Sequence, residues 1–218
     1  MLSTSLKTAA EPIWSAQFRH PFITGLGNGS LAAERFQFYL AQDYLYLIDY
    51  CRVFAYGAAK APDPATMTEF AVMLHETLSV EMDLHRAMCR GFGIEAAVLE
   101  QTTKAPVTQG YTDFLVATAA SGDLMDIMAA LLPCAWGYRD VGEYLMGMDP
   151  IAGNPYADWI AMYVGAEYGA FVDTCIALTD RLGEGLPTWR VVQLQRTFQT
   201  STRYEAAFWE MGWTRQTW

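Results

Sequence analysis

Asp43 is a carboxylate in the middle of an aromatic stripe. Residues three and four positions apart share one face of a helix, and at that spacing Asp43 lies with Tyr39, Tyr46, Tyr50 and Phe54. An ionised carboxylate in apolar surroundings must be paired or hydrogen-bonded, because desolvating it alone is costly. Asp43 is therefore either a structural group, bonded by a tyrosine hydroxyl or a helix end, or a group that binds a polar ligand.

Glu205 repeats this pattern near the C-terminus. Its predicted helical face carries Phe198, Ser201, Phe208 and Trp209. A glutamate in an apolar pocket has a raised pKa and can exchange protons near neutral pH, which general acid or base catalysis requires. The structural alternative is a salt bridge to an arginine, and Arg139 and Arg203 are the candidates.

Cys134 follows Pro133 inside an otherwise uninterrupted helical pattern, MAALLPCAWGYRDVGEYL, residues 128–145. Its stripe contains Ile127, Leu131, Tyr138, Val141 and Leu145. A proline inside a helix removes a backbone hydrogen bond and frees the carbonyl near Ala129, usually with a kink. We expect this break to leave room for a pocket beside the thiol. Cys134 is then either an inert buried side chain, as most buried cysteines are, or a nucleophile.

Tyr111 and Tyr163 add two phenols to this set. Tyr111 lies between "TQG" and "TDFL", and Tyr163 lies in "AMYVGAEYGAF". A tyrosine on a helix more often packs at an interface than contacts a ligand, because its ring is apolar and only its hydroxyl is polar. Both interpretations stay open from the residues alone.

The segments that must position these residues have helical periodicity. Ser30 should cap a helix that runs to about Lys60, and Asp63 should start the next one, which runs to Gly91. Further helical patterns cover roughly residues 109–120, 123–147, 155–182 and 188–212. The sequence has no alternating strand pattern and no internal repeat. It predicts an all-α fold in a single domain, residues 1–218, with helices apolar on several sides that indicate a buried central helix or a subunit interface.

Composition and charge exclude some classes of partner. The chain has 218 residues, of which 52% are hydrophobic, so it can bury a sizeable core. Its formal net charge of −10 argues against nucleic acid and anionic membranes as partners. The longest uncharged apolar stretch, residues 127–138, is too short to span a bilayer, and the N-terminus lacks a signal-peptide pattern. We therefore expect a cytoplasmic protein.

The three histidines argue against two metal-dependent alternatives. A di-iron site in a helical bundle needs two Glu-x-x-His motifs, and His20, His75 and His85 cannot supply them. His20, the early candidate for a haem ligand, is expected to bond backbone at a helix end. His75 and His85, with Glu76 and Glu81, are expected to form a polar, partly solvated face. No metal site is predicted.

Four stretches carry a resemblance to a known family. They are HPFITGLGNGSLAAERFQFYLAQDYLYL, ALLPCAWGYRDVGE, NPYADWIAMYVGAEY and STRYEAAFWEMGW. In this order and at this spacing they resemble the TenA family, the thiaminase II enzymes of thiamine salvage, over about residues 13–213. Because it contains Cys134, the chain resembles the cysteine-containing branch of that family.

The resemblance implies a haem-oxygenase-like helical bundle, usually a homotetramer, with a pyrimidine pocket in each subunit. It implies hydrolysis of 4-amino-5-aminomethyl-2-methylpyrimidine, with thiamine as a further candidate substrate, to the hydroxymethylpyrimidine, and no cofactor. By residue match, Cys134 resembles the nucleophile, Glu205 the acid/base, and Asp43 the carboxylate that binds and protonates the aminopyrimidine edge. The remaining matches are substrate-binding residues: Tyr46 and Phe208 resemble pocket walls, and Tyr111, Tyr138 and Tyr163 resemble phenols that bond the ring or tune the thiol.

Two positions depart from the family pattern. Ala135 stands where relatives often carry a bulky aromatic residue, and Val164 stands where some have a small one. These differences affect the expected width of the pocket and hence the substrate range more than the reaction class. The alternative function is a non-catalytic protein that binds a pyrimidine, or a regulator, on the same fold.

Overall fold

The computed structural model describes residues 1–148 and 153–218. Its elements are α1 (Leu2–Gln17), α2 (Pro21–Gly27), α3 (Ala33–Lys60), α4 (Pro64–Glu76), η1 (Thr77–Glu81), α5 (Met82–Gly91), α6 (Ala96–Gln101), α7 (Pro106–Ser121), α8 (Leu124–Met146), α9 (Ala157–Val164), α10 (Ala166–Leu182) and α11 (Thr188–Thr214). Within these two ranges every regular element is helical, and η1 is a π-helical turn. The predicted all-α fold is confirmed.

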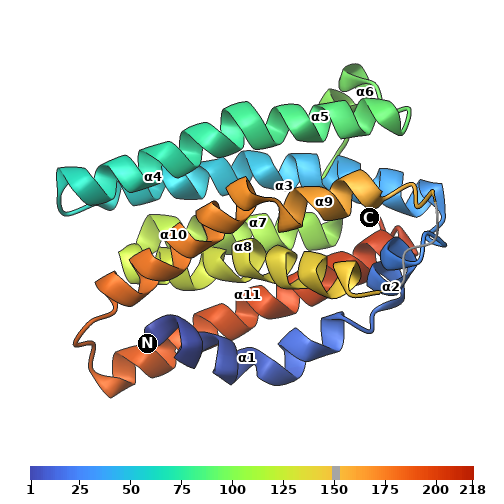
Figure 1. Cartoon of the computed structure of the whole chain (residues 1–218). Helices are drawn as coiled ribbons and strands as arrows, with labels where there is room; N and C mark the ends of the chain where they lie inside the picture. The colour runs from blue at the N-terminus through green and yellow to red at the C-terminus, as the bar shows by residue number, and fades with distance from the viewer. Residues whose placement is uncertain (149–152) are drawn as a thin grey trace.

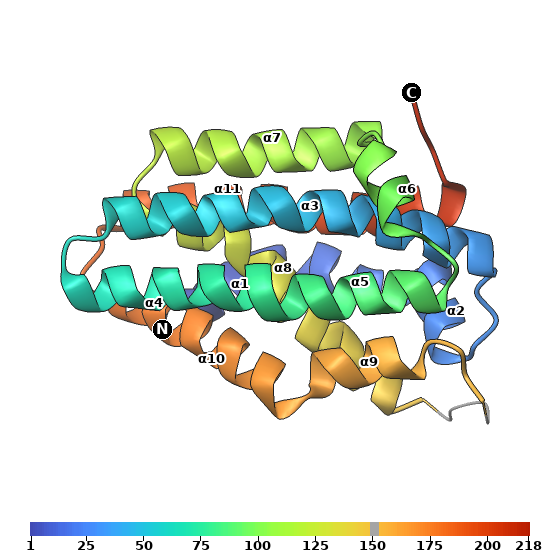
Figure 2. The same ribbon diagram turned by 90° about the horizontal axis from the view of Figure 1, so that it is seen from above.

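The axes of the long helices are roughly parallel or antiparallel to one another, and the other helices surround α8 (Figures 1 and 2). α8 packs against α7, α9, α10 and α11, and α1 packs on the other side of α11. α3 lies between α7 on one side and α4 and α5 on the other (Figure 2). The side chains of one buried core cluster come from helices along the whole chain, from Leu2 to Met211.

α8 is the buried central helix that the apolar pattern indicated. Every residue from Ile127 to Ala135 is buried, so this stretch has no solvent-facing side. Its start is fixed by a capping box, in which the Asp123 side chain accepts from the backbone of Asp126 and the Asp126 side chain accepts from the backbone of Asp123. The helix continues through Pro133. Cys134 is therefore held in the interior.

Several predicted boundaries are confirmed and several are wrong. Asp63 caps α4 through a bond from the backbone of Thr66, as predicted. Ser30 does not cap α3, which begins after Ala32 without a side-chain cap. The pattern at residues 155–182 is two helices, because Gly165 has an extended backbone between α9 and α10. α1, α2 and α6 have no counterpart among the predicted helices. None of the described helices is long and apolar enough to cross a membrane.

The predicted helix at residues 63–91 contains the π turn η1 between α4 and α5. A π turn accommodates one extra residue and so rotates the two flanking helices relative to each other. In an uninterrupted α-helix, His75 and His85 would be about 80° apart around the axis, whereas one absorbed residue brings them to about 180°. His75 is exposed and His85 is buried, as this rotation requires.

Candidate active site

Asp43, Cys134 and Glu205 come from three helices that pack on one another. α3 carries Asp43, α8 carries Cys134 and α11 carries Glu205, and each pair of these helices is in contact. All three residues are buried. The charges of Glu205 and Asp43 both raise the pKa of the Cys134 thiol, and the charge of Asp43 raises the pKa of Glu205. The three groups thus lie on the buried sides of three helices that pack on one another.

Glu205 is held by hydroxyl groups. Tyr111 Oη donates to Glu205 Oε1 at 2.6 Å and lies 2.9 Å from Ser201 Oγ. Burial raises the pKa of Glu205 to about 8, although the bond from Tyr111 opposes that shift. The predicted alternative of a salt bridge is wrong for both arginines, because Arg139 pairs with Asp173 and Arg203 is exposed.

The Cys134 thiol is protonated in the resting protein. Burial raises its pKa well above the usual value, the charge of Glu205 adds to the rise, and the Tyr46 hydroxyl opposes it. Cys134 keeps 8% of its surface accessible and Glu205 keeps 4%, whereas Leu131 and Phe198 keep none. Cys134 and Glu205 are therefore less completely enclosed than these two apolar side chains.

Asp43 is bonded by a histidine that the sequence pattern had placed on a solvated face. His85 Nε2 lies 3.1 Å from Asp43 Oδ2, and His85 Nδ1 lies 3.5 Å from Cys89 Sγ. Burial disfavours a charged ring, yet the hydrogen bonds to Asp43 and Cys89 raise the pKa of His85 to about 10. The expectation of a polar face is correct for His75 and Glu76, which are exposed, and wrong for buried His85.

Aromatic rings line the region between these groups. The Tyr46 ring centroid lies 5.0 Å from that of Tyr111 and 5.8 Å from that of Phe208, in an edge-on arrangement. The Tyr46 hydroxyl is buried and has no hydrogen-bond partner among the described residues. A buried hydroxyl without a partner is costly. The Tyr46 hydroxyl is therefore available to a ligand or to the neighbouring sulfur.

Tyr138 and Tyr163 form a second aromatic group. Tyr138 and Tyr39 share a hydroxyl–hydroxyl bond of 3.1 Å, and the rings of Tyr138 and Tyr163 are 4.8 Å apart. Burial is the largest cause that raises the pKa of Tyr46, Tyr111, Tyr138 and Tyr163 well above 10. These phenols are neutral, so they can donate hydrogen bonds but cannot act as resident bases.

Gly142 allows α8 and α9 to approach closely, a role that the sequence analysis missed. A Cβ atom at Gly142 would lie 3.0 Å from Val164 Cγ1 and 3.2 Å from Tyr163 Cβ. The absence of a side chain therefore permits the contact that brings Tyr163 to Tyr138. Val164 lies at this crossing, and Ala135 is buried with its carbonyl oxygen bonded by Tyr168 Oη at 3.0 Å.

The carbonyl groups around Pro133 receive hydroxyl donors. Ser201 Oγ donates to the Ala130 carbonyl at 2.5 Å, and Tyr50 Oη donates to the Leu131 carbonyl at 3.1 Å. α11 and α3 thereby hold the segment of α8 that immediately precedes Cys134. The proline position matters to the site through these bonds as well as through the shape of the helix.

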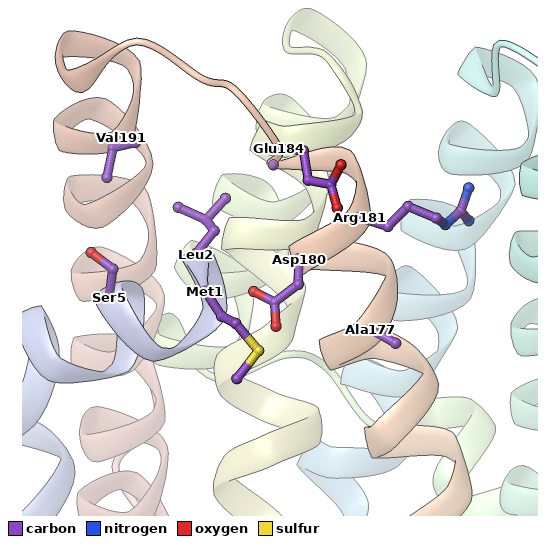
Figure 3. Close-up of a pocket in the computed structure, with 9 residues that line it drawn as sticks. Met1, Leu2, Ser5, Ala177, Asp180, Arg181, Glu184 and Val191 are labelled. Carbon is purple, nitrogen blue, oxygen red and sulfur yellow. The ribbon is translucent and has the colours of Figure 1, made fainter.

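An open recess of about 730 Å³ lies elsewhere on the molecule (Figure 3). It is formed by the start of α1, the end of α10 and the start of α11, and its lining includes Met1, Asp180 and Val191. Asp180 is engaged there, because it accepts bonds from the backbone and hydroxyl of Ser3. None of the catalytic candidates lines this recess. Among the residues that the structure describes, no group of His, Cys, Asp or Glu side chains is arranged to hold a metal ion.

Comparisons with known proteins agree with this arrangement. The TENA/THI-4/PQQC family profile matches residues 7–215. A relative from Halalkalibacterium halodurans, named aminopyrimidine aminohydrolase, is 42% identical over 99% of this chain and 97% of its own. A relative of the same name from Bacillus subtilis is 34% identical over 99% of this chain and 91% of its own.

Two solved structures have the same architecture. A protein from Silicibacter sp. TM1040, described as a TenA family transcription regulator, is 34% identical and superposes with a TM-score of 0.90 over 98% of this chain and 97% of its own. A domain of unknown function with a heme oxygenase-like fold from Shewanella denitrificans is 14% identical, with a TM-score of 0.76 over 97% of this chain and 92% of its own. The second likeness confirms the predicted bundle type. The chain belongs to the TENA/THI-4/PQQC family.

Proposed function

We propose that the protein is an aminopyrimidine aminohydrolase, which hydrolyses 4-amino-5-aminomethyl-2-methylpyrimidine to the 5-hydroxymethyl compound and ammonia in thiamine salvage. The full-length relatives of that name support this activity. The observation that carries the proposal is the convergence of one thiol and two carboxylates from three helices on one buried region. No cofactor takes part in the chemistry proposed below.

The first step is attack of the Cys134 sulfur on the unsubstituted carbon of the pyrimidine ring. The thiol proton passes to Glu205 in its carboxylate form, which is the minor form below about pH 8, as the sulfur–carbon bond forms, and the ring electrons move onto a ring nitrogen. A thiol is suited to this step because sulfur is a strong nucleophile that also leaves readily. Since the resting thiol is protonated, its proton must be removed when the substrate is bound, and Glu205 is the base that the site offers.

The second stage exchanges the amine for water. The electrons on the ring nitrogen return, the bond from the methylene carbon to the amine breaks, and protonated Glu205 supplies the proton with which ammonia leaves. Water adds to the exocyclic methylene carbon, the sulfur departs and the ring becomes aromatic again. The balance is one amine and one water consumed, and one alcohol and one ammonia formed.

Binding of the ring is assigned to Asp43 and the aromatic residues. Asp43 can accept a hydrogen bond from the exocyclic amino group and hold the adjacent protonated ring nitrogen, which makes the ring a better electrophile. Tyr46 and Phe208 supply ring faces for stacking. Tyr111, Tyr138 and Tyr163 are neutral donors that can bond the ring or orient the thiol and Glu205.

A homotetramer in the cytoplasm is the assembly that we propose for the working enzyme. Exposed apolar side chains gather on α4, η1 and α5, which lie on one outer face of the bundle (Figure 1). They are Met67, Val72, Leu78, Val80 and Leu84. Exposed apolar side chains on an outer face are typical of contact surfaces. All four cysteines are free thiols, which suits a reducing compartment, and the shared core suits action as a single domain.

Ammonia release from 4-amino-5-aminomethyl-2-methylpyrimidine tests the activity. We expect the protein to release ammonia, and we expect Cys134→Ser and Glu205→Gln each to lower kcat at least roughly 100-fold, because each removes a group that acts in bond making or proton transfer. Cys175→Ser is the matched control, since Cys175 is a buried free thiol outside the site, and it should retain most activity.

The contrary result is an active Cys134→Ser variant or a parent protein that binds the pyrimidine without turnover. The first would end the covalent route, and the second would favour a binding or regulatory protein. The turnover of thiamine, measured in parallel with that of the aminomethylpyrimidine, shows which leaving group is preferred. The net charge of −10 weighs against a regulator that acts by binding DNA directly.

A further inference from the structure

His85 is a buried titratable group that the chemistry above does not use. It is 3% exposed, and both ring nitrogens have partners, Asp43 Oδ2 at 3.1 Å and Cys89 Sγ at 3.5 Å. Buried charged groups require pairing, and His85 is the side chain that hydrogen-bonds Asp43. Its partner is the residue assigned to the aminopyrimidine edge.

The π turn η1 is what points His85 inward. If Thr77–Glu81 continued as a regular α-helix, His85 would lie about 80° from the exposed His75 around the axis instead of on the opposite side. π turns inside α-helices occur frequently at functional sites. Here the turn directs one side chain of α5 at Asp43 of α3, across a helix pair that is in contact.

The contact with His85 makes the two carboxylate oxygens of Asp43 different from each other. Oδ2 is bonded to His85, whereas Oδ1 has no hydrogen bond to any described residue. Asp43 keeps 4% of its surface accessible, as does Glu205. The bond at Oδ2 restricts rotation of the carboxylate, so the orientation of Oδ1 depends on His85.

Other groups also face the histidine. Cys89 lies on its own helix, Tyr44 of α3 has its ring centroid 6.2 Å from the imidazole, and Glu81 lies one helical turn before it in η1. Desolvation and the charge of Asp43 raise the pKa of Glu81 to about 7, and His85 opposes that rise. Asp43 is the group that hydrogen-bonds His85 from a neighbouring helix, so the effect of His85 on the site passes through Asp43.

We propose that His85 is a positioning residue that donates from Nε2 to Asp43 Oδ2 and thereby holds Oδ1 toward the amino edge of the pyrimidine. This inference rests on the proposed function, because it assigns His85 a part in the binding of that substrate. A misplaced binding group costs catalysis because the reacting atoms lose alignment. We expect that replacing His85 lowers the affinity only for ligands that carry the exocyclic amino group.

Two ligands and two variants test this expectation. Calorimetry compares the product, 4-amino-5-hydroxymethyl-2-methylpyrimidine, with 5-hydroxymethyl-2-methylpyrimidine, which lacks the amino group. His85→Gln should weaken binding of the first ligand roughly 10-fold or more and change the affinity for the second by no more than about 2-fold. The same variant should lose about 10- to 100-fold in kcat/KM. His75→Gln, on the exposed side of the π turn, is the control and should change neither ligand. Equal weakening of both ligands by His85→Gln would overturn the proposal, since a general loss of structure acts on both.

A double-mutant cycle asks whether the effect passes through Asp43. In an Asp43→Asn background, His85→Gln should reduce kcat/KM by no more than about 2-fold further, because the group that it positions is already lost. Full additivity of the two losses would contradict the inference. A parent protein that releases no ammonia would instead defeat the proposed function, so the two failures are distinguishable.

The unmodified protein offers a measurement that does not depend on the folding of a variant. In protein labelled with ¹⁵N-histidine, the His85 Nε2 signal at pH 8 should be that of a protonated nitrogen, and it should shift when the hydroxymethylpyrimidine binds. An unprotonated Nε2, or a signal that ignores the ligand, would overturn the proposal.

Discussion

Burial sets the protonation of the two groups that are proposed to exchange a proton. The pKa of the Cys134 thiol is raised by burial and by the charge of Glu205, and burial raises the pKa of Glu205 to about 8. The low dielectric that keeps the thiol neutral also makes Glu205 a stronger base than an exposed glutamate. The raised pKa of Glu205 favours proton transfer from the thiol, and the raised pKa of Cys134 opposes it.

Burial of Glu205 lowers the free energy of unfolding by an amount that depends on pH. The folded protein holds a proton on Glu205 up to about pH 8, whereas the ordinary value is 4.5. Between these values the folded state binds more protons than the unfolded state, so this contribution to stability is present at low pH and is lost as the pH rises through 8. Glutamine at this position would carry no such penalty.

Glu205→Gln should therefore stabilise the protein at high pH. At pH 9 the free energy of unfolding of the variant should exceed that of the parent by up to the order of 4 kcal/mol, and at pH 5 the two should be close. Urea unfolding of both proteins at the two pH values measures the difference. A gap that stays the same at pH 5 and pH 9 would mean that the carboxyl of Glu205 does not titrate in this range.

At the scale of the elements, two local departures from the α-helix matter for the site. Pro133 lies in α8 where hydroxyls from α3 and α11 bond the carbonyls of Ala130 and Leu131, and η1 turns His85 toward Asp43. The proline could be found in the sequence, because proline has a known effect on a helix. The π turn could not, because Thr77–Glu81 contains no residue type that marks one. His85 was therefore misplaced for a geometric reason.

Removal of one hydroxyl tests how the segment before Cys134 is held. Tyr50→Phe leaves the Leu131 carbonyl without the bond from Tyr50 in a buried setting, and we expect a loss of about 1–3 kcal/mol in the free energy of unfolding. Tyr56→Phe is the control, because Tyr56 lies on the same helix and is 37% exposed. Urea unfolding that finds the two variants equally stable would contradict this role of Tyr50.

At the scale of the whole molecule, periodicity predicted the helical class and most of the long helices. The stripes around Asp43, Cys134 and Glu205 predicted that each faces inward, and the resemblance to the TenA family supplied their common purpose. Single-helix patterns could not reveal that the three meet, because the relative placement of helices depends on packing. α1, α2 and α6 were missed: α1 contains Pro12, and α2 and α6 have only seven and six residues. The break between α9 and α10 at Gly165 was missed because it is a change in the backbone of one residue.

The interior region between α3, α8 and α11 is thus where the pyrimidine is expected, rather than the open recess near the N-terminus. A crystal structure of the unmodified protein with 4-amino-5-hydroxymethyl-2-methylpyrimidine tests this most directly. We predict that the ring packs against Tyr46 and Phe208, with its amino group at Asp43 and its unsubstituted carbon in contact with the Cys134 sulfur. A ligand bound at the recess around Asp180, or a ring whose amino edge faces away from Asp43, would contradict it.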